Sequence, residues 1–422
     1  MTELETRAAV LAASHPQAVR RLRWAFLGVA LLAGIVLAAL SIRQWAMFGI
    51  QRPLTLDFAL YRACSIQGMQ YGWGQLYDVN IQRQVYQAQE AAYPTAGTMA
   101  FAPNVCTPLE GWLTLPLAAV PLPAGYLIWS LLIFAATAFA FWTLAPGTAL
   151  AKLVQVALAF GPYPVLLSLS EGQVTSFQIA GAAACWLLLR RGRDGWAGIA
   201  LLPLALKPQT LAMVPLTLLV TGRLRTFGAW LAGSAVLGLA VLANLGIDGT
   251  VAYLHRIQFA SSNPAGYLGG PWYNLTAHFQ TRLGRYGAEA LAGALALFVA
   301  WRHRGAGPEV PIAAGLVGSL LVAPYLHLDD FITMFPAAWL ILRAHSRRWL
   351  WALIAGGYVV VLLCTDTGTA RWGEGLLLFE LTLMIVLCVI GMPKTSATDA
   401  SMKVLAGQAP PPRPVPVDAR TS

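Results

Sequence analysis

The chain has 422 residues and a formal net charge of +10, yet only 11% of its residues are charged and 57% are hydrophobic. Soluble domains carry about 25% charged residues, so this composition excludes an ordinary soluble domain. The basic residues stand in short clusters between apolar runs rather than along one face, which argues against nucleic-acid binding. We interpret these clusters as the topology signals of a polytopic membrane protein.

Apolar runs long enough to cross a bilayer as helices, about 20 residues each, recur along the chain. The first, Trp24–Gln44, follows the basic residues Arg20, Arg21 and Arg23 and is long for a cleavable signal peptide, so we interpret it as a retained span. The others are predicted at Ala124–Leu144, Leu150–Leu167, Val174–Leu189, Trp196–Leu206, Thr210–Val220, Phe227–Leu245, Tyr286–Trp301, Val310–Ala323, Phe331–Leu342, Trp349–Cys364 and Gly373–Ile390. The stretch Val105–Val120, interrupted by two prolines, is either a further span or a re-entrant or interfacial segment. The sequence therefore predicts an all-α protein with about twelve or thirteen transmembrane helices.

The loops alternate in charge along the chain. Short basic loops, such as Arg190–Arg193, Arg302–Arg304 and Arg343–Arg348, alternate with loops that are nearly free of Arg and Lys. By the positive-inside rule the basic loops are cytoplasmic and the other set faces outward.

This alternation divides the chain into parts. We predict a cytoplasmic segment at 1–23 and a membrane domain at 24–392, with long extracytoplasmic loops at 45–104 and 246–285. The Pro-rich tail, 393–422, is predicted to be a disordered cytoplasmic segment because it has too little apolar surface to bury.

Polar residues suited to chemistry stand on the predicted outer side. Asp57 lies early in the first outer loop among apolar neighbours, where partial desolvation raises the basicity of a carboxylate and favours a general base. The alternative is a structural role, in which Asp57 pairs with Arg62 or caps a helix that starts at Phe58. His327 and Asp329 form an outer turn suited to proton transfer or substrate orientation, and His-x-Asp-Asp is weak evidence for a metal site. The alternative is a polar turn in which Asp329 or Asp330 caps the next helix, and Asp330 fits that N-cap position.

Two more polar residues lie on the same side. Gln173 follows Glu171 and Gly172 in an outer turn, and Lys207 precedes a proline that interrupts an apolar stretch. A lysine at a helix break suits a phosphate anion, and the alternative is a lysine that snorkels to the interface. No cysteine or histidine spacing indicates a metal site. Cys64 and Cys106 share the first outer loop, so a disulfide is one alternative there, but two free thiols are expected.

With these residues in place, the chain resembles glycosyltransferase family 87, the polyprenyl-phosphate-mannose-dependent mannosyltransferases of the GT-C superfamily. The resemblance runs from about Thr55 to His327. It rests on Asp57-Phe58-x-x-Tyr61, Leu76-Tyr77-Asp78, Phe101-Ala102-Pro103, Gly172-Gln173, the Arg190–Arg193 cluster with Ala197-Gly198, Lys207-Pro208, and Pro324-Tyr325-Leu326-His327-x-Asp329. The chain departs from the family at Phe101-Ala102-Pro103-Asn104, where a Tyr-x-Pro-Pro-type element is usual.

The resemblance implies a GT-C-type fold with a large first extracytoplasmic loop and an active site on the outer face. It implies an inverting transfer of a hexose, mannose in the family, from a polyprenyl-phosphate sugar to a glycolipid or glycan acceptor. Asp57 matches the family's general base and His327 matches a family histidine near the site, so these two are the expected catalytic residues. The expected substrate contacts are Tyr61, Arg62, Gln173, Lys207 and Asp329.

No cofactor is expected, because the lipid-linked sugar phosphate is a substrate and the chain has no Gly-rich phosphate loop; the need for a divalent metal stays open at this point. The expected partners are the polyprenyl-phosphate sugar, the acceptor and the bilayer of the plasma (inner) membrane, with no nucleic acid. The alternative function is a secondary transporter of a small polar or amphiphilic solute. Transporters usually carry an internal repeat and place polar groups near the midplane, and neither feature is evident in this sequence.

Overall fold

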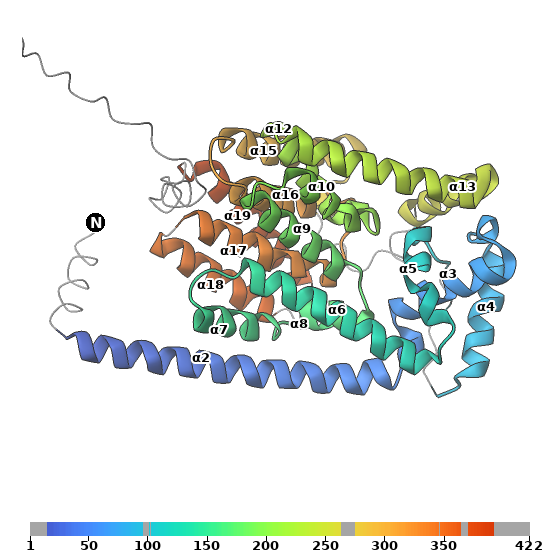
Figure 1. Ribbon diagram of the computed structural model, residues 1–422, viewed down its shortest axis with the longest axis horizontal. Coiled ribbons are helices and arrows are strands. Elements are labelled where there is room, and N and C mark those ends of the chain that lie inside the picture. The colour runs from blue at the N-terminus through green and yellow to red at the C-terminus, as the bar shows by residue number, and fades with distance from the viewer. Residues whose placement is uncertain are drawn as a thin grey trace, which may run out of the picture. The chain divides into compact units, whose positions relative to one another are not determined.

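The computed structural model describes residues 15–95, 101, 103–262, 275–345, 347–363 and 370–391. Met1–Ile390 forms one compact unit, and the second unit, Gly391–Ser422, falls almost wholly outside the described residues together with the predicted disordered tail. Helices make up the regular structure, and no strand occurs in the described part (Figure 1). The predicted all-α membrane fold is confirmed.

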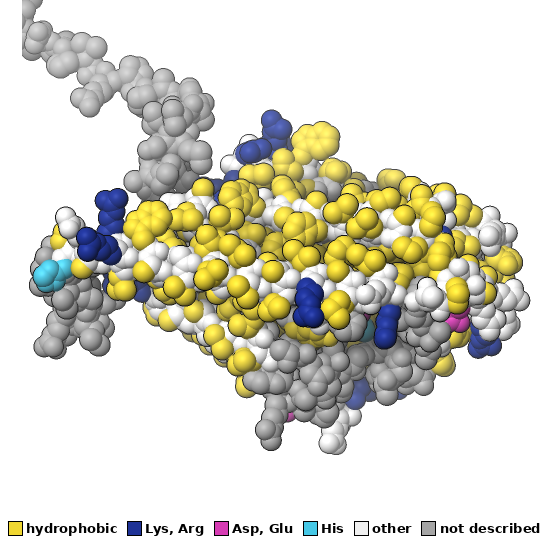
Figure 2. Space-filling model, turned by 90° about the horizontal axis from the view of Figure 1, so that it is seen from below, with side chains coloured by type: hydrophobic (Ala, Val, Ile, Leu, Met, Phe, Trp, Pro, Cys, Tyr) yellow, Lys and Arg dark blue, Asp and Glu magenta, His cyan; other side chains and the backbone are white. Residues whose placement is uncertain are grey.

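The first helix, α2 (Pro16–Trp45), is longer than the predicted span and runs on into a π-helical turn, Ala46–Ile50. Its apolar side chains are largely exposed, including Phe26 at 70% and Val29 at 68%. Figure 2 shows a face of the molecule covered by hydrophobic side chains, with few charged residues among them. Exposed apolar surface of this extent belongs in lipid rather than in water.

The first outer loop, predicted at 45–104, is largely helical. It contains α3 (Asp57–Tyr71) and α4 (Val79–Ala92), and α5 (Pro108–Ala118) follows after it. Because α5 has 11 residues, it is only about 17 Å long and too short to cross a bilayer alone. This length favours the re-entrant or interfacial interpretation of the segment Val105–Val120.

The helices α6 (Leu122–Leu144) and α9 (Thr175–Arg190) pack side by side, and Thr137 Oγ1 lies 2.9 Å from Ser176 Oγ between them. Between these helices in the chain, α7 (Ala149–Ala159) and α8 (Tyr163–Glu171) form an apolar pair bent by 73°. The prolines at the start of α8 account for the break, since proline lacks the N–H that would continue the preceding helix.

A short helical hairpin carries Lys207 at its turn. Its first arm is α10 (Asp194–Ile199) with the 3-10 turn Leu202–Ala205, and its second arm is α11 (Pro208–Leu211) with α12 (Met213–Val220). The hairpin closes at the opposite end, where Arg223 Nη1 lies 3.8 Å from Asp194 Oδ1.

The long helix α13 (Leu224–Ser262) is broken at Gly246, whose φ of 66° lies in the left-handed region that favours glycine. It is followed by the 3-10 turn Leu275–His278 and by α15 (Arg282–Arg302). The second outer loop, predicted at 246–285, is therefore helical at its beginning. Its middle part, 263–274, lies outside the described residues.

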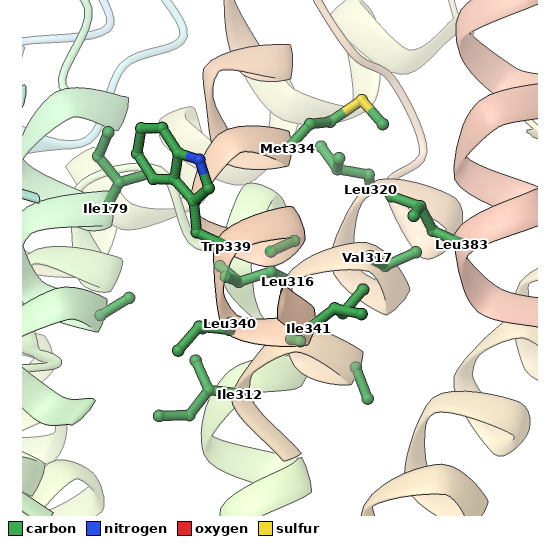
Figure 3. Close-up of a cluster of buried hydrophobic side chains, with 14 of the residues drawn as sticks. Ile179, Ile312, Leu316, Val317, Leu320, Met334, Trp339, Leu340, Ile341 and Leu383 are labelled. Carbon is green, nitrogen blue, oxygen red and sulfur yellow. The ribbon is translucent and has the colours of Figure 1, made fainter. Parts of the chain in front are cut away.

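The core of the unit is built around α16 (Glu309–Val322), which is buried along most of its length. The 3-10 helix η7 (Leu328–Thr333), α17 (Met334–Ala344), α18 (Arg348–Leu363) and α19 (Ala370–Val389) follow it in the chain. Figure 3 shows Leu316 and Leu320 of α16 among side chains of α9, α17 and α19. A helix that is apolar on every side is stable only when other helices or lipid surround it.

Four of the described helices are long and apolar enough to cross a membrane, or five if the bent pair α7 and α8 counts as one span. Four more apolar stretches are shorter, including both arms of the Lys207 hairpin. The number of twelve or thirteen spans remains a prediction.

Candidate active site

Asp57 lies at the start of α3 and is held by a residue far away in the chain. One oxygen of its carboxylate accepts a hydrogen bond from Gln173 Nε2, which stands just before α9. Gln173 also accepts through Oε1, from the Tyr61 hydroxyl at 3.4 Å and from Lys207 Nζ at 3.5 Å. Gln173 therefore connects α3 with the hairpin turn.

Lys207 has two carboxylate partners on η7. Its ammonium nitrogen lies 2.6 Å from Asp330 Oδ1 and 3.6 Å from Asp329 Oδ2, and the three side chains are 11%, 0% and 4% exposed. Charges buried to this degree require partners of opposite sign. Thr175 Oγ1 adds a hydrogen bond of 3.2 Å to Asp330 Oδ1.

The backbone around Lys207 is also fixed. Its carbonyl accepts from Gln178 Nε2 at 2.7 Å and from the Thr210 hydroxyl at 2.8 Å, and Thr210 in turn bonds Gln178 Oε1 at 2.6 Å. Gln178 Nε2 also lies 3.4 Å from the carbonyl of Leu204, the group that the missing N–H of Pro208 leaves without its helical donor. The site is therefore preorganised at the helix break.

His327 completes the cluster as the N-cap residue of η7, and its backbone N–H donates to Asp330 Oδ2 at 2.9 Å. Its ring stands edge-on to the Tyr325 ring at a centroid distance of 5.9 Å, and Gln209 Nε2 donates to the Tyr325 hydroxyl at 2.7 Å. His327 is near enough to Asp57 to affect its ionisation.

The structure decides between several alternatives that the sequence left open. Arg62 does not pair with Asp57; its guanidinium donates to Gln89 Oε1 and to the carbonyls of Leu117, Ala118 and Val120. Arg62 is thus the one predicted substrate contact that is directed away from the cluster. Asp57 does not cap α3, because Leu56 is the N-cap residue.

Two further interpretations are corrected. Asp330 is not an N-cap residue but the third residue of η7, and its carboxylate binds both the His327 N–H and Lys207. Lys207 does not snorkel to the interface, because its ammonium group is buried against these acids. A single sequence gives no signal for the Lys207–Asp330 pair, which joins residues 123 positions apart.

Burial sets the electrostatics of the acids. Desolvation raises the pKa of Asp57 above its ordinary value of 3.8, while His327 and Lys207 oppose the shift. Desolvation likewise raises the pKa of Asp329 to about 6, against the lowering effect of Lys207. A carboxylate whose pKa is raised in this way is a stronger base than one in water.

An apolar groove of about 470 Å³ lies beside the cluster. Its walls come from the start of α5, from the Lys207 hairpin and from α13: Thr107, Pro108, Leu109, Leu204, Ala205, Pro208, Ala212, Leu216, Trp230, Ser234, Leu237, Gly238, Val241 and Tyr253. Pro208 directly follows Lys207 in the chain, so the groove and the polar cluster share the hairpin turn.

The basic loops gather at the other ends of the same helices. Arg343 donates to the carbonyls of Thr143, Leu144 and Ala145 at the end of α6, and Arg190 at the end of α9 lies 3.8 Å from Glu309. The 16 residues of α9 separate Arg190 from Gln173 by about 24 Å. The cluster and the basic loops therefore lie at opposite ends of the helix bundle, as the charge alternation predicts.

Metal and disulfide sites are not evident in the described part of the chain. No group of three or more His, Cys, Asp or Glu residues is placed to hold a metal ion there. Cys64 and Cys106 are free thiols, as expected. The Asn104 amide contacts both residues: its nitrogen contacts Cys64 Sγ, and its oxygen accepts from the Cys106 N–H.

Comparison with known families adds a second line of evidence. Neither curated proteins nor solved structures gave a match to this chain. The sequence pattern of glycosyltransferase family 87 matches residues 106–324, just over half of the 422 residues. This match supports a membrane glycosyltransferase rather than the transporter. The chain therefore belongs to glycosyltransferase family 87 and is an integral membrane glycosyltransferase that acts on a sugar donor and an acceptor.

Proposed function

We propose that this enzyme transfers mannose from a polyprenyl-phosphate sugar to a glycolipid or glycan acceptor on the extracytoplasmic face of the plasma membrane. The observation that carries the proposal is that a polar cluster and an apolar groove share one helix break, where Pro208 of the groove directly follows Lys207 of the cluster. A lipid-linked sugar likewise combines an apolar part and a polar part, since its phosphate carries a hydrocarbon tail on one side and a sugar on the other.

The groove accommodates part of the polyprenyl tail. Its walls are almost entirely apolar, and the exposed apolar side chains of α13, such as Leu239 at 65%, indicate that this helix faces lipid. A tail that enters from the bilayer would bring its phosphate to the hairpin turn beside Lys207. A tail of this kind gains about 0.8 kcal/mol for each CH₂ group that it buries.

Asp57 acts as the general base in this reaction. Its carboxylate accepts the proton of the acceptor hydroxyl while that oxygen forms a bond to the anomeric carbon. The bond from the anomeric carbon to the phosphate oxygen breaks, and its electron pair leaves with polyprenyl phosphate. A single displacement of this kind inverts the anomeric centre, so a β-linked donor gives an α-linked product.

Gln173 and Lys207 orient the carboxylates of the site. Gln173 fixes the Asp57 carboxylate, and Lys207 holds Asp329 and Asp330 in place. Because Lys207 is already paired with two acids, its positive charge is largely compensated before a phosphate arrives. His327 orients the substrate or makes a secondary proton transfer, Asp329 contacts the substrate, and we propose that no cofactor takes part.

The experiment uses the purified protein in lipid nanodiscs with labelled polyprenyl-phosphate mannose and a total membrane glycolipid extract as acceptor. We expect label to enter the extract, and we expect α-mannosidase to release it from the product. Transfer from GDP-mannose in the absence of polyprenyl phosphate would refute the proposed donor. A product that resists α-mannosidase and yields to β-mannosidase would refute the inverting mechanism.

A further inference from the structure

Glu110 occupies a position that the mechanism above does not use. It lies in the first turn of α5, directly after Thr107, Pro108 and Leu109, all three of which line the apolar groove. Its carboxyl group also interacts electrostatically with Asp57 and Lys207. Glu110 therefore directly follows the groove wall in the chain and lies within electrostatic range of the proposed base.

The side chain of Glu110 is almost completely buried, with 4% of its surface exposed. Its carboxyl group accepts hydrogen bonds from the Cys106 thiol and from the Thr107 backbone N–H. The second bond is typical of a glutamate at the third position of a helix, which reaches back to the N-cap residue. Capping alone does not account for the whole group, because Oε2 has no hydrogen-bond partner within the described residues.

A buried oxygen without a partner costs about 1–3 kcal/mol, so such atoms are rare unless they have a ligand or a function. The helix that carries Glu110 is fixed against α3. Ser65 Oγ bonds the Gly111 carbonyl at 2.6 Å and Thr114 Oγ1 at 2.8 Å, and Thr114 Oγ1 bonds the Tyr61 carbonyl at 3.0 Å. The free oxygen therefore has a defined position relative to Asp57.

The surroundings of Glu110 favour its neutral form. Burial raises the pKa of Glu110 to about 8, while the Cys106 thiol and Lys207 oppose the shift and Asp57 adds to it. The titratable groups that face it from the neighbouring elements are Asp57, Tyr61 and Cys64 of α3, Tyr77, Cys106, Lys207, Tyr253 of α13 and Tyr325. Lys207 is the one cation in this set, and it is bound by Asp329 and Asp330.

We propose that Glu110 is a donor-binding residue whose carboxylic acid O–H donates a hydrogen bond to an oxygen of the donor phosphate. This inference rests on the proposed polyprenyl-phosphate sugar donor. Along that donor the phosphate joins the tail to the sugar. Glu110 directly follows three residues of the groove wall and interacts electrostatically with Asp57 and Lys207. A carboxylate at this place would repel the phosphate, whereas a carboxylic acid binds it.

The same hydrogen bond strengthens as the reaction proceeds. When the bond to the anomeric carbon breaks, its electron pair remains on the phosphate oxygen and the negative charge of the phosphate increases. Hydrogen bonds to ionised acceptors are stronger than those to neutral ones. The proton stays on Glu110, so the residue assists departure of polyprenyl phosphate without an additional proton transfer.

The test measures binding of polyprenyl-phosphate mannose to the full-length protein in nanodiscs between about pH 6.5 and pH 9.5. This ligand is a phosphodiester and keeps one negative charge over the whole range. We expect the wild-type affinity to fall above about pH 8, by up to tenfold per pH unit, as Glu110 ionises. Glu110→Gln retains a neutral donor and the cap acceptor, so we expect its affinity to stay constant with pH.

Two further variants complete the design. Glu110→Ala should weaken binding of the donor about 3–10-fold at neutral pH, the usual effect of losing one hydrogen bond, and should leave binding of the phosphate-free polyprenol unchanged. Glu374→Gln on the exposed surface of α19 is the matched control and should keep the wild-type pH profile.

The outcomes separate this inference from the proposed function. A wild-type affinity that is constant up to about pH 9.5, or a Glu110→Gln variant with the wild-type profile, would overturn the role of Glu110 alone. Equal loss of polyprenol and donor binding in Glu110→Ala would also overturn it, because it would indicate a structural role. A wild-type protein that binds no polyprenyl phosphate of any kind would overturn the proposed function as well.

Discussion

Replacement of Asp57 by Asn is the most direct test of the proposed mechanism. The substitution removes the proton-accepting charge and keeps the shape of the side chain. The structure indicates that the fold should tolerate it. Asp57 forms no ion pair with Arg62, whose donors bind Gln89 and three backbone carbonyls, so no buried cation loses its partner.

The expected magnitudes differ strongly between stability and rate. The Gln173 Nε2 donor can still bond the side-chain carbonyl oxygen of the introduced asparagine, so stability should change by no more than about 1 kcal/mol, the net value of one hydrogen bond. Loss of a positioned general base should lower turnover by about 10²–10⁴-fold. Because the pKa of Asp57 is raised by burial, the wild-type rate should rise with pH through that pKa, and the Asp57→Asn variant should lack this rise.

The assay records turnover with polyprenyl-phosphate mannose, together with donor affinity and the thermal midpoint of each protein. His327→Ala is the comparison variant and should lose less turnover, since its role is orientation or a secondary proton transfer. A well-folded Asp57→Asn protein with near-normal turnover would remove Asp57 from the mechanism. A variant that loses donor binding or its thermal transition would point to a structural role instead.

Three further predictions concern the charges around the site. Lys207→Met leaves two buried carboxylates without their cation, so it should destabilise the protein by about 3–5 kcal/mol. Arg223→Met, at the partly exposed ion pair with Asp194, should cost less than about 1 kcal/mol. Equal thermal midpoints for the two variants would contradict the buried pair. Burial raises the pKa of Asp329 from 3.8 to about 6, so the folded protein binds this proton more tightly than the unfolded chain does. The contribution of Asp329 to stability should therefore be greatest near pH 4 and decline on the order of 3 kcal/mol up to about pH 6. Thermal scans of Asp329→Asn should lack this decline. In a Cys-free background, a membrane-impermeant thiol reagent applied from outside should label Asp248→Cys and not Arg191→Cys, both exposed positions, and the reverse pattern would invert the topology.

The composition and the charge pattern of the sequence determined the class of fold. Low charge content and repeated apolar runs require a membrane environment, because a helix without a polar face is stable only in lipid or in a protein core. The alternation of basic loops also predicted that Asp57, Gln173, Lys207 and His327 lie at one end of the bundle. The structure has this arrangement, with Arg190 and Arg343 at the other end.

Local patterns could not determine how the polar residues pair. Asp57 was also suited to pair with Arg62 five positions along the same helix, and Asp330 fitted an N-cap. Both interpretations relied on neighbours in sequence. The actual partners are Gln173 and Lys207, which are more than 100 positions away and come close only when the helices pack.

The groove and the role of Glu110 are likewise tertiary features. In the sequence Glu110 is an ordinary first-turn acid of a short helix, and the walls of the groove come from three separate parts of the chain. The start of α5, the Lys207 hairpin and α13 together form one apolar surface, and the buried Glu110 directly follows its α5 wall in the chain. Sequence alone determined which environment the chain occupies, because hydropathy is a local property. Only the packed helices decided which charges meet, because burial and pairing depend on distance in space.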